Sequence, residues 1–399
     1  MTVQCDVLIT YGWCRSSYTA LRSLRRLGLR VAVADSGRVG MSQWSRLRAC
    51  AGLYAPPLTE PEAFVADVAR LLRQTGARFL LPGHDETEIL AGYRAQLPAH
   101  VCLPVADAAQ LVRANDKAQT AMLAAELGLP VPQTIRYSSL VELNHQLRDR
   151  SQPLVVKLRR GNGAKGVFYP DTPAAAVQLC ADLIDQYRLA PTRFPIVQER
   201  IHGEGWGVSC LYWQGQRLAS FTHRRLREKT TTGGTSTMRI SARNVELEAM
   251  AHRLLDRLNW HGLAMVEFKY DPAAKQGWFI EINPRLWGSI HLAVSAGVDF
   301  PVLLYLAATQ GVAAARQQVR PYQTGVVARW YLGDLIVAAG QLRQGRAVPA
   351  LKLLWPGGTD TLDDWYWDDP TAFVGQAAYY LATFLKMRSL NPVKEGMLG

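Results

Sequence analysis

The chain has 399 residues, of which 48% are hydrophobic and 20% are charged, and its formal net charge is +12. This composition is typical of a soluble globular protein with a sizeable core, and the length predicts two to four domains. The sequence holds no run approaching the roughly 18 apolar residues that a membrane-spanning helix requires. Its first residues lack the charged and apolar zones of a secretion signal. We therefore expect a cytoplasmic protein without a transmembrane segment.

The cysteines and the arginines exclude several other classes. The six cysteines form no CxxC pair, so buried free thiols are expected rather than a disulfide framework or a zinc site. Between Arg15 and Arg48 there are eight arginines and a single acid, Asp35. We interpret this stretch as a solvated basic face, with an anionic substrate, partner or peripheral membrane surface as the alternative. The arginines are not interleaved with aromatic residues and no nucleic-acid-binding motif is present, so no nucleic-acid partner is expected.

Strands and helices alternate over the first 110 residues. The apolar pattern predicts strands at 7–9, 31–34, 79–81 and 101–103, and helices after position 16 and near 61–74 and 86–95. The first helix should have Ser16 or Ser17 as its N-cap and end at Gly28. Such alternation predicts a parallel sheet with helices on both faces. The first turn reads YGWCRSS instead of GxGxxG, which disfavours dinucleotide binding in this Rossmann-like unit.

The pattern becomes mixed after a helix predicted at 117–127. A strand and a helix are followed by several strands with hairpin-like spacing, and further helices are predicted at 245–258 and 301–309. Helical-looking segments with tryptophans follow Tyr322. Their role stays open among a lid, a dimer surface and a partner-docking helix pair.

Two strands carry the sharpest chemical signal, MVEFKY at 265–270 and WFIEIN at 278–283. Because side chains alternate between the faces of a strand, Glu267 and Lys269 share one face, and so do Glu281 and Asn283. If the strands pair as a hairpin, two carboxylates and one amide oxygen converge. Such oxygen ligands suit Mg²⁺, and Arg285 would lie beside them to bind phosphate oxygens. The alternative is a solvated sheet face.

A glycine-rich loop follows the predicted strand at 154–156. It carries lysines and glycines that could surround an anion, namely Lys157, Gly161, Gly163, Lys165 and Gly166. It is not a P-loop, because GxxxxGK[ST] is missing. A hairpin that closes over a triphosphate and an ordinary flexible hairpin are both compatible with it. Lys117 is a single lysine near a predicted helix start, and by itself it indicates almost nothing about function.

Taken in chain order, these pieces resemble the ATP-grasp superfamily over about residues 1–312. The chain looks most like the carboxylate–amine ligase-like branch, which is related to biotin carboxylase and carbamoyl-phosphate synthase. The stretches that carry the resemblance are NDK at 115–117, VVKLRRGNGAKGV at 155–167, VQERIHGEGWGVS at 197–209, GGTST at 233–237, AMVEFKYD at 264–271 and FIEINPRLWGS at 279–289.

The resemblance implies a fold of the α/β and α+β classes with four parts. These are a Rossmann-like pre-ATP-grasp domain, the two subdomains of the ATP-grasp fold and a helical C-terminal extension, expected at 1–112, 113–193, 194–315 and 316–399. The implied cofactors are ATP and Mg²⁺, with Mn²⁺ as an alternative ion. A homodimer is one expected assembly.

Site residues follow from the same resemblance. Lys117 and Lys157 would bind the ATP phosphates, and the loop 161–166, which includes Gly161, Gly163, Lys165 and Gly166, would cover them. Gln198, Glu199 and Ile201 would lie at the hinge beside adenine, and Glu204 would hold the ribose. The metal ligands would be Glu267, Glu281 and Asn283, with Arg285 near the transferred phosphoryl group.

Two regions are candidates for the acceptor substrates. The stretch 224–239 combines Arg225, Arg227 and Arg239, and arginine forks match carboxylate geometry. Arg239 is therefore included with Arg285 and Lys157 among the expected catalytic residues, although an exposed basic loop is the alternative. His84, Asp85 and Glu86 would bind an amine or cap a helix.

The function implied is ATP-dependent activation of a small-molecule carboxylate as an acyl phosphate, followed by its capture by an amine. The alternatives are a relative with another nucleophile, an ATP-binding regulatory protein without turnover, and a protein that binds a peripheral anionic surface.

Overall fold

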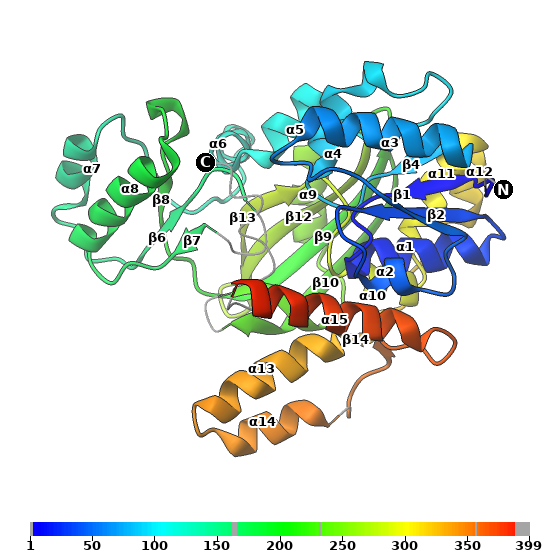
Figure 1. Ribbon diagram of the computed structural model, residues 1–399. Helices are drawn as coiled ribbons and strands as arrows, with labels where there is room; N and C mark the ends of the chain where they lie inside the picture. The colour runs from blue at the N-terminus through cyan, green and yellow to red at the C-terminus, as the bar shows by residue number, and fades with distance from the viewer. Residues whose placement is uncertain (1–2, 162–165, 231–232, 356, 388–399) are drawn as a thin grey trace.

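The computed structural model of the chain describes residues 3–161, 166–230, 233–355 and 357–387. Three sheets organise these residues: two four-stranded sheets and one seven-stranded sheet. Figure 1 shows the seven-stranded sheet in the middle, with the N-terminal domain on one side and the lobe of α7 and α8 on the other. This mixed α/β architecture is the predicted one.

The N-terminal domain is built on a parallel sheet in the order β3-β2-β1-β4. Its strands are β1 (Val7–Ile9), β2 (Val31–Asp35), β3 (Cys50–Leu53) and β4 (Phe79–Leu81). The helices are α1 (Arg15–Arg26), α2 (Met41–Trp44), α3 (Pro61–Thr75) and α4 (Glu86–Gly92). Residues of β1 and β2 are buried on both faces, as expected for a parallel sheet covered by helices.

Two local predictions in this domain are wrong. The strand expected at 101–103 is reduced to one isolated bridge, between Phe79 and Cys102. Helix α1 begins at Arg15 with Cys14 as its N-cap, so Ser16 and Ser17 lie inside the helix. Ser17 is buried there, and its hydroxyl donates to the carbonyl of Thr10 at 3.0 Å instead of capping the helix.

The next unit carries the glycine-rich loop. Helices α5 (Ala108–Asn115) and α6 (Lys117–Glu126) lead into it. Its antiparallel sheet has the order β5-β8-β6-β7, with β5 (Thr134–Ile135), β6 (Leu154–Lys157), β7 (Val167–Phe168) and β8 (Ile196–Glu199). Helices α7 (Leu140–Leu147) and α8 (Pro173–Tyr187) cover one face through a separate apolar cluster.

The seven-stranded sheet has the order β13-β12-β9-β10-β11-β14-β15. Its first five strands are β9 (Glu204–Trp213), β10 (Gln216–Thr230), β11 (Gly233–Ser241), β12 (Gly262–Asp271) and β13 (Gln276–Asn283). Alternate side chains of β9 and β12 enter different cores. Val208 and Val266 pack with α9 (Val245–Arg257), whereas Leu211 and Met265 share a cluster with residues of α1, α10 (Ile290–Ser295) and α11 (Phe300–Thr309).

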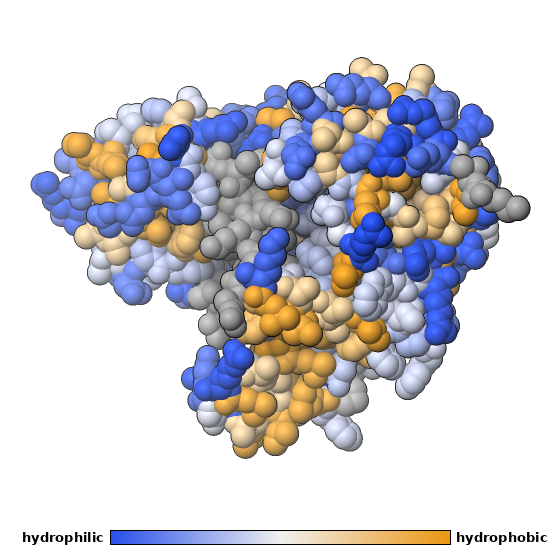
Figure 2. Space-filling view, in the orientation of Figure 1, coloured by the Kyte–Doolittle hydropathy of each residue, from blue (hydrophilic) through white to orange (hydrophobic). Residues whose placement is uncertain are grey.

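The C-terminal extension is mainly helical, as predicted, but it also completes the large sheet. Its helices are α12 (Val312–Gln318), α13 (Tyr331–Arg343), α14 (Ala347–Leu354) and α15 (Pro370–Met387). Strand β14 (Val327–Arg329) pairs with β11, and β15 (Thr361–Leu362) pairs with β14. Helix α15 then returns to α2 (Figure 1), and apolar side chains gather over α13, α14 and α15 (Figure 2).

Candidate active site

A cavity of about 810 Å³ lies where these units meet. Each part of the chain supplies lining residues, such as His84 from the N-terminal domain, Lys157 from β6, Glu281 from β13 and Tyr380 from α15. This volume falls within the range of small-molecule sites. Because the walls come from separate units, the cavity depends on how those units are packed together.

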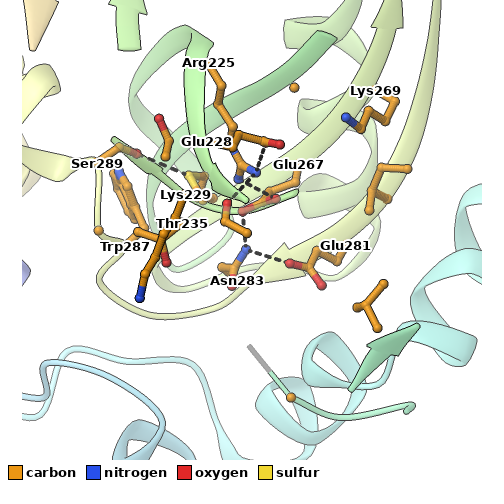
Figure 3. Close-up of a pocket in the computed structure, with 18 of the residues that line it drawn as sticks. Arg225, Glu228, Lys229, Thr235, Glu267, Lys269, Glu281, Asn283, Trp287 and Ser289 are labelled. Atoms are coloured by element: carbon orange, nitrogen blue, oxygen red, sulfur yellow. Dashed lines mark hydrogen bonds and ion pairs between the residues drawn. The ribbon is translucent and has the colours of Figure 1, made fainter. Parts of the chain in front are cut away.

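Two carboxylates, Glu267 and Glu281, lie on neighbouring strands in one wall of this cavity, with Asn283 next to both (Figure 3). Strands β12 and β13 pair in antiparallel register with Glu267 opposite Glu281 and Met265 opposite Asn283. Asn283 Nδ2 lies 3.0 Å from Oε1 of Glu267 and 3.5 Å from Oε1 of Glu281. The three side chains therefore converge, as the alternation of the two strands predicts.

Basic side chains surround this group. Lys117 Nζ lies 3.2 Å from Oε2 of Glu281, and Arg225 Nη2 lies 2.6 Å from Oε2 of Glu267. Lys157, the last residue of β6, is buried and also lines the cavity. Arg285 Nη2 donates to Oδ1 of Asn283 at 3.0 Å. The result is a dense patch of opposite charges in which an anion would meet several cations.

Burial and neighbouring charges shift the pKa values in this patch. Burial lowers the pKa of Lys157 to about 8, and Glu281 partly opposes this effect. Burial by itself would raise the pKa of Glu281, but Lys117 and Lys157 outweigh it and hold the pKa below its usual range. Burial raises the pKa of Glu267, with Arg225 acting in the opposite direction. The two carboxylates are therefore not equivalent.

The donor set fits a magnesium ion. Mg²⁺ usually takes one or two carboxylates and completes its shell with water and phosphate oxygens. Glu267 and Glu281 are donors of that kind. The amide oxygen of Asn283, which here accepts from Arg285 while Nδ2 faces the carboxylates, would join them after rotation of the amide group. Across the residues that the structure describes, no group of three or more His, Cys, Asp or Glu side chains forms a metal site. An ion held here would complete its shell with water and phosphate oxygens.

An apolar slot adjoins the charged patch. Val155 and Val167 line it from β6 and β7, and Phe268 and Ile280 line it from β12 and β13. A slot between two sheets suits a flat ring. At the hinge end the cavity is lined by Glu199, Arg200 and Ile201, two of which the sequence singled out.

Two other expected nucleotide ligands do not line the cavity. The amide of Gln198 is buried and donates to Oγ1 of Thr134 at 2.8 Å. The expectation that Glu204 holds the ribose stays a prediction. Its carboxylate accepts from Arg224 at 2.9 Å and from Trp206 at 3.2 Å. Gly203 and Gly205, on either side of Glu204, line the cavity.

Part of the glycine-rich loop can be placed. The carbonyl of Gly161 accepts from Lys117 Nζ at 2.8 Å, and Gly161 lines the cavity. Gly166 has a φ of +69°, and its carbonyl accepts from the amide of Leu158 at 2.8 Å. Gly163 and Lys165 lie outside the described residues.

The three arginines predicted to bind an acceptor substrate, Arg225, Arg227 and Arg239, occupy different environments. Arg225 lines the cavity. Arg227 pairs with Asp334 of α13 at 2.5 Å, and Arg239 pairs with Asp363 at 2.5 Å, where both side chains are fully buried. The expectation that Arg239 acts in catalysis is therefore corrected, since its charge stabilises the junction with the C-terminal extension. Its partner lies 124 residues away in the sequence, so local spacing could not reveal it.

The residues after β4 have separate roles. His84 lines the cavity and stacks on Tyr11 with ring centroids 4.6 Å apart. Asp85 accepts from Arg285 Nε at 2.9 Å and does not cap α4 through its side chain. Glu86 is buried against Thr10, whose hydroxyl donates to it at 2.6 Å, and burial raises its pKa to about 7. Glu86 is thus a structural residue, whereas His84 and Asp85 belong to the site.

The aromatic part of the cavity was not predicted. Tyr11 and Trp13 contribute from the YGWCRSS turn, and Trp330 and Tyr380 from the extension. Trp13 stacks on Tyr379 at 4.4 Å, and the Arg15 guanidinium lies 4.0 Å from the ring centre of Trp330. The aromatic residues of the first turn were the available signal, but their partners come from the far end of the chain.

Part of the chain matches a known protein family. Residues 193–332 match the family described as "ATP-grasp in the biosynthetic pathway with Ter operon". No curated protein matches the sequence.

Solved structures with the same fold cover most of the chain. Rhizobium etli pyruvate carboxylase is 15% identical, with a TM-score of 0.62 over 79% of this chain and 30% of that one. This chain therefore spans less than a third of that protein. Campylobacter jejuni biotin carboxylase, in complex with an ATP analogue, is 12% identical, with a TM-score of 0.63 over 81% of this chain and 74% of that one. An L-amino acid ligase from Bacillus licheniformis is 16% identical, with a TM-score of 0.60 over 82% and 79%.

The predicted resemblance is thus confirmed by the family match and by the fold. The paired carboxylates of β12 and β13 lie within the matched segment. Residues 193–332 thus match an ATP-grasp family, and the chain has the ATP-grasp fold over most of its length.

Proposed function

We propose that the chain is a ligase that uses MgATP to activate a substrate carboxylate as an acyl phosphate and then couples it to an amine. The observation that carries this proposal is the convergence of Glu267, Glu281 and Asn283 beside Lys157 and Arg285. This is the combination of metal ligands and cations that phosphoryl transfer requires. The ATP-grasp fold supports the proposal, and one structural relative is itself an amino acid ligase.

The nucleotide is assigned to the apolar slot and the charged patch. Adenine would lie between Val155 and Ile280, close to the backbone of Glu199 and Ile201, and the phosphates would extend toward Lys117 and Lys157. Bound Mg²⁺, or Mn²⁺ in its place, would supply positive charge at the phosphate oxygens. Glu267, Glu281 and Asn283 would hold that ion.

Two steps follow from this placement. A carboxylate oxygen attacks the γ-phosphorus, the bond to the bridging oxygen breaks, and ADP leaves. Lys157 and Arg285 neutralise the charge on the transferred group. The amine nitrogen then attacks the carbonyl carbon of the acyl phosphate, phosphate leaves, and the nitrogen gives up a proton. No nucleophilic side chain of the protein is needed.

The acceptor substrates are assigned to the aromatic part of the cavity. Tyr11, Trp13, Trp330 and Tyr380 offer ring surfaces there, and Arg15 carries a positive charge among them. Such walls favour a substrate with a flat or apolar group, because aromatic stacking adds to the burial of apolar area. We therefore expect aromatic acids or amines to be used better than small aliphatic ones.

The test is release of ADP and phosphate from MgATP with pooled carboxylates and pooled amines. We compare the wild type with Glu281→Gln, and with Glu246→Gln as a matched control, because Glu246 is exposed on α9 outside the cavity. Glu281→Gln should reduce release on the order of 100-fold, the size expected when one contact to transition-state charge is lost. Glu246→Gln should leave it unchanged.

The substrate pools distinguish a ligase from the alternative functions. Release that needs both pools supports a ligase, and dividing the pools identifies the pair. Release with carboxylates alone would indicate a kinase-like reaction and contradict the coupling step. Tight MgATP binding in calorimetry without release from any pool would instead favour a regulatory protein.

A further inference from the structure

Helices α13, α14 and α15 expose a continuous apolar surface (Figure 2). We call it the extension face; its exposed apolar side chains are Leu342, Val348, Leu351, Leu354, Trp355, Val374, Leu381 and Leu385. Trp355 is 75% exposed and Val348 is 65% exposed. Single exposed apolar residues are common on proteins, but a surface of this size marks an interaction site.

The charges beside the extension face have one sign. Arg343, Arg346 and Lys352 are exposed on the α13–α14 hairpin, and Lys386 is exposed near the end of α15. The sequence contains no acid between positions 335 and 355, and α15 contains none either. The surface therefore combines leucine, valine and tryptophan with arginine and lysine, in a chain whose net charge is +12.

Buried contacts on the opposite side of α13 and α15 anchor the extension face to the rest of the protein. Asp334 of α13 is fully buried, and it pairs with Arg227 of β10 at 2.5 Å and with Arg329 of β14. Helix α15 packs on α2, and its buried residues Gln376 and Tyr380 line the cavity. The exposed apolar side chains are thus presented by anchored helices rather than by a loose tail.

We propose that the extension face docks on the surface of an anionic lipid bilayer. Surface-lying helices bind such membranes by burying tryptophan, leucine and similar side chains at the headgroup boundary while lysine and arginine contact the anionic lipids. Tryptophan suits that boundary, because it has an apolar ring and a polar N–H group. The helices lie on the membrane, since no helix of the described residues is long and apolar enough to cross it.

Charge argues against a second copy of the chain as the occupant. An interface between two identical faces would bring Arg343, Arg346 and Lys352 toward the same residues of the other copy. No acid lies between positions 335 and 355 to balance them, and Asp334 of α13 is buried against Arg227 and Arg329. Like charges across an interface oppose association. An anionic membrane balances these charges and buries the apolar side chains at the same time.

Docking would bring the active site close to lipid. Helix α15 turns Gln376 and Tyr380 to the cavity and Val374 and Leu381 to the extension face. A helix with its side chains is ~10–12 Å across. The aromatic part of the cavity would therefore lie about one helix diameter from the headgroups, which suits a substrate that partitions into the membrane.

The experiment is co-sedimentation of the full chain with vesicles of phosphatidylcholine and with vesicles that also contain phosphatidylglycerol, each at low and high salt. We expect binding to the anionic vesicles that weakens with salt. The variant R343Q/R346Q/K352Q should lower the partition coefficient on the order of 100-fold, because each basic residue near an anionic surface contributes about one kcal/mol. Leu351→Glu should also weaken binding, at unchanged ATP affinity.

The matched control is R73Q/R78Q/R257Q, which removes the same net charge from three exposed arginines of the N-terminal domain and α9. It should bind anionic vesicles like the wild type. Equal losses in the two triple variants would show non-specific attraction and overturn the proposal. So would a folded monomer that ignores anionic vesicles, or light scattering that shows a dimer which Leu351→Glu converts to a monomer.

Discussion

Arginines of one short segment, 224–239, have unrelated roles in this chain. Arg225 faces the cavity and pairs with Glu267, whereas Arg239 is fully buried against Asp363. Asp363 also pairs with Arg15, so one buried carboxylate serves two guanidinium groups. Burial by itself would raise the pKa of Asp363, but Arg239 and Arg15 outweigh it and hold the pKa below its usual range. This group joins the N-terminal domain, the large sheet and the extension.

We expect Arg239→Met to lower the free energy of unfolding by about 3 kcal/mol, because it removes one partner of a buried ion pair. Urea denaturation of the purified protein measures the change. Asp363→Leu should cost at least as much, since it leaves two buried guanidinium groups facing each other. The double variant should cost less than the sum of the two single changes. A variant Arg239→Met with unchanged stability and a raised KM for a carboxylate would show that Arg239 binds substrate after all.

Two helices of the extension contain an interior glycine, and their surroundings differ. On Gly375 of α15 an added Cβ would lie 2.4 Å from the carbonyl oxygen of Gly40 and 2.9 Å from Cβ of Trp44. On Gly340 of α13 it would meet nothing within 4 Å. Helix α15 thus approaches α2 at a distance that only glycine allows, and this contact positions the wall formed by Gln376 and Tyr380.

Alanine at the two glycines should have opposite effects. Gly340→Ala should stabilise the protein by up to about 1 kcal/mol, because alanine loses less backbone freedom in a helix. Gly375→Ala should destabilise it by about 1–3 kcal/mol. The clash of the new Cβ with Gly40 and Trp44 costs more free energy than alanine gains through its higher helix propensity. Thermal unfolding of both variants provides the comparison. If Gly375→Ala were as stabilising as Gly340→Ala, the close packing of α15 on α2 would be contradicted.

How much the sequence could predict depended on how far apart the interacting residues lie along the chain. The β12–β13 hairpin and its convergent carboxylates followed from a period-two pattern across a short turn, because both strands are local. The contacts of Glu204 with Arg224 and Trp206 could not be predicted, because the resemblance supplied a residue but not its face of the strand. The pairing of Arg15 with Asp363 spans 348 positions, and no pattern of composition or spacing carries such information. The aromatic part of the cavity was missed for the same reason.

The whole molecule encloses its cavity between units that have separate cores. One cluster of buried side chains belongs to the sheet of β6 and β8, and another belongs to the N-terminal sheet. Lys157 approaches the cavity from the first of these units, and Glu281 approaches it from the large sheet. A ligand that contacts both sides would therefore bridge parts of the chain that otherwise pack independently.

MgATP should raise the unfolding temperature through this bridging. A ligand that binds only the folded state stabilises it by RT ln(1 + [L]/Kd), or about 2.7 kcal/mol at a concentration of 100 Kd. This corresponds to a shift of a few degrees for a chain of this size. Differential scanning fluorimetry with MgATP, with ATP and a chelator, and with Mg²⁺ alone would measure it. The full shift should need both components, and Glu267→Gln should reduce it because Glu267 would hold the ion. An equal shift with ATP and chelator would mean that the carboxylates of β12 and β13 do not bind a metal, and that the cations around them bind the nucleotide by themselves.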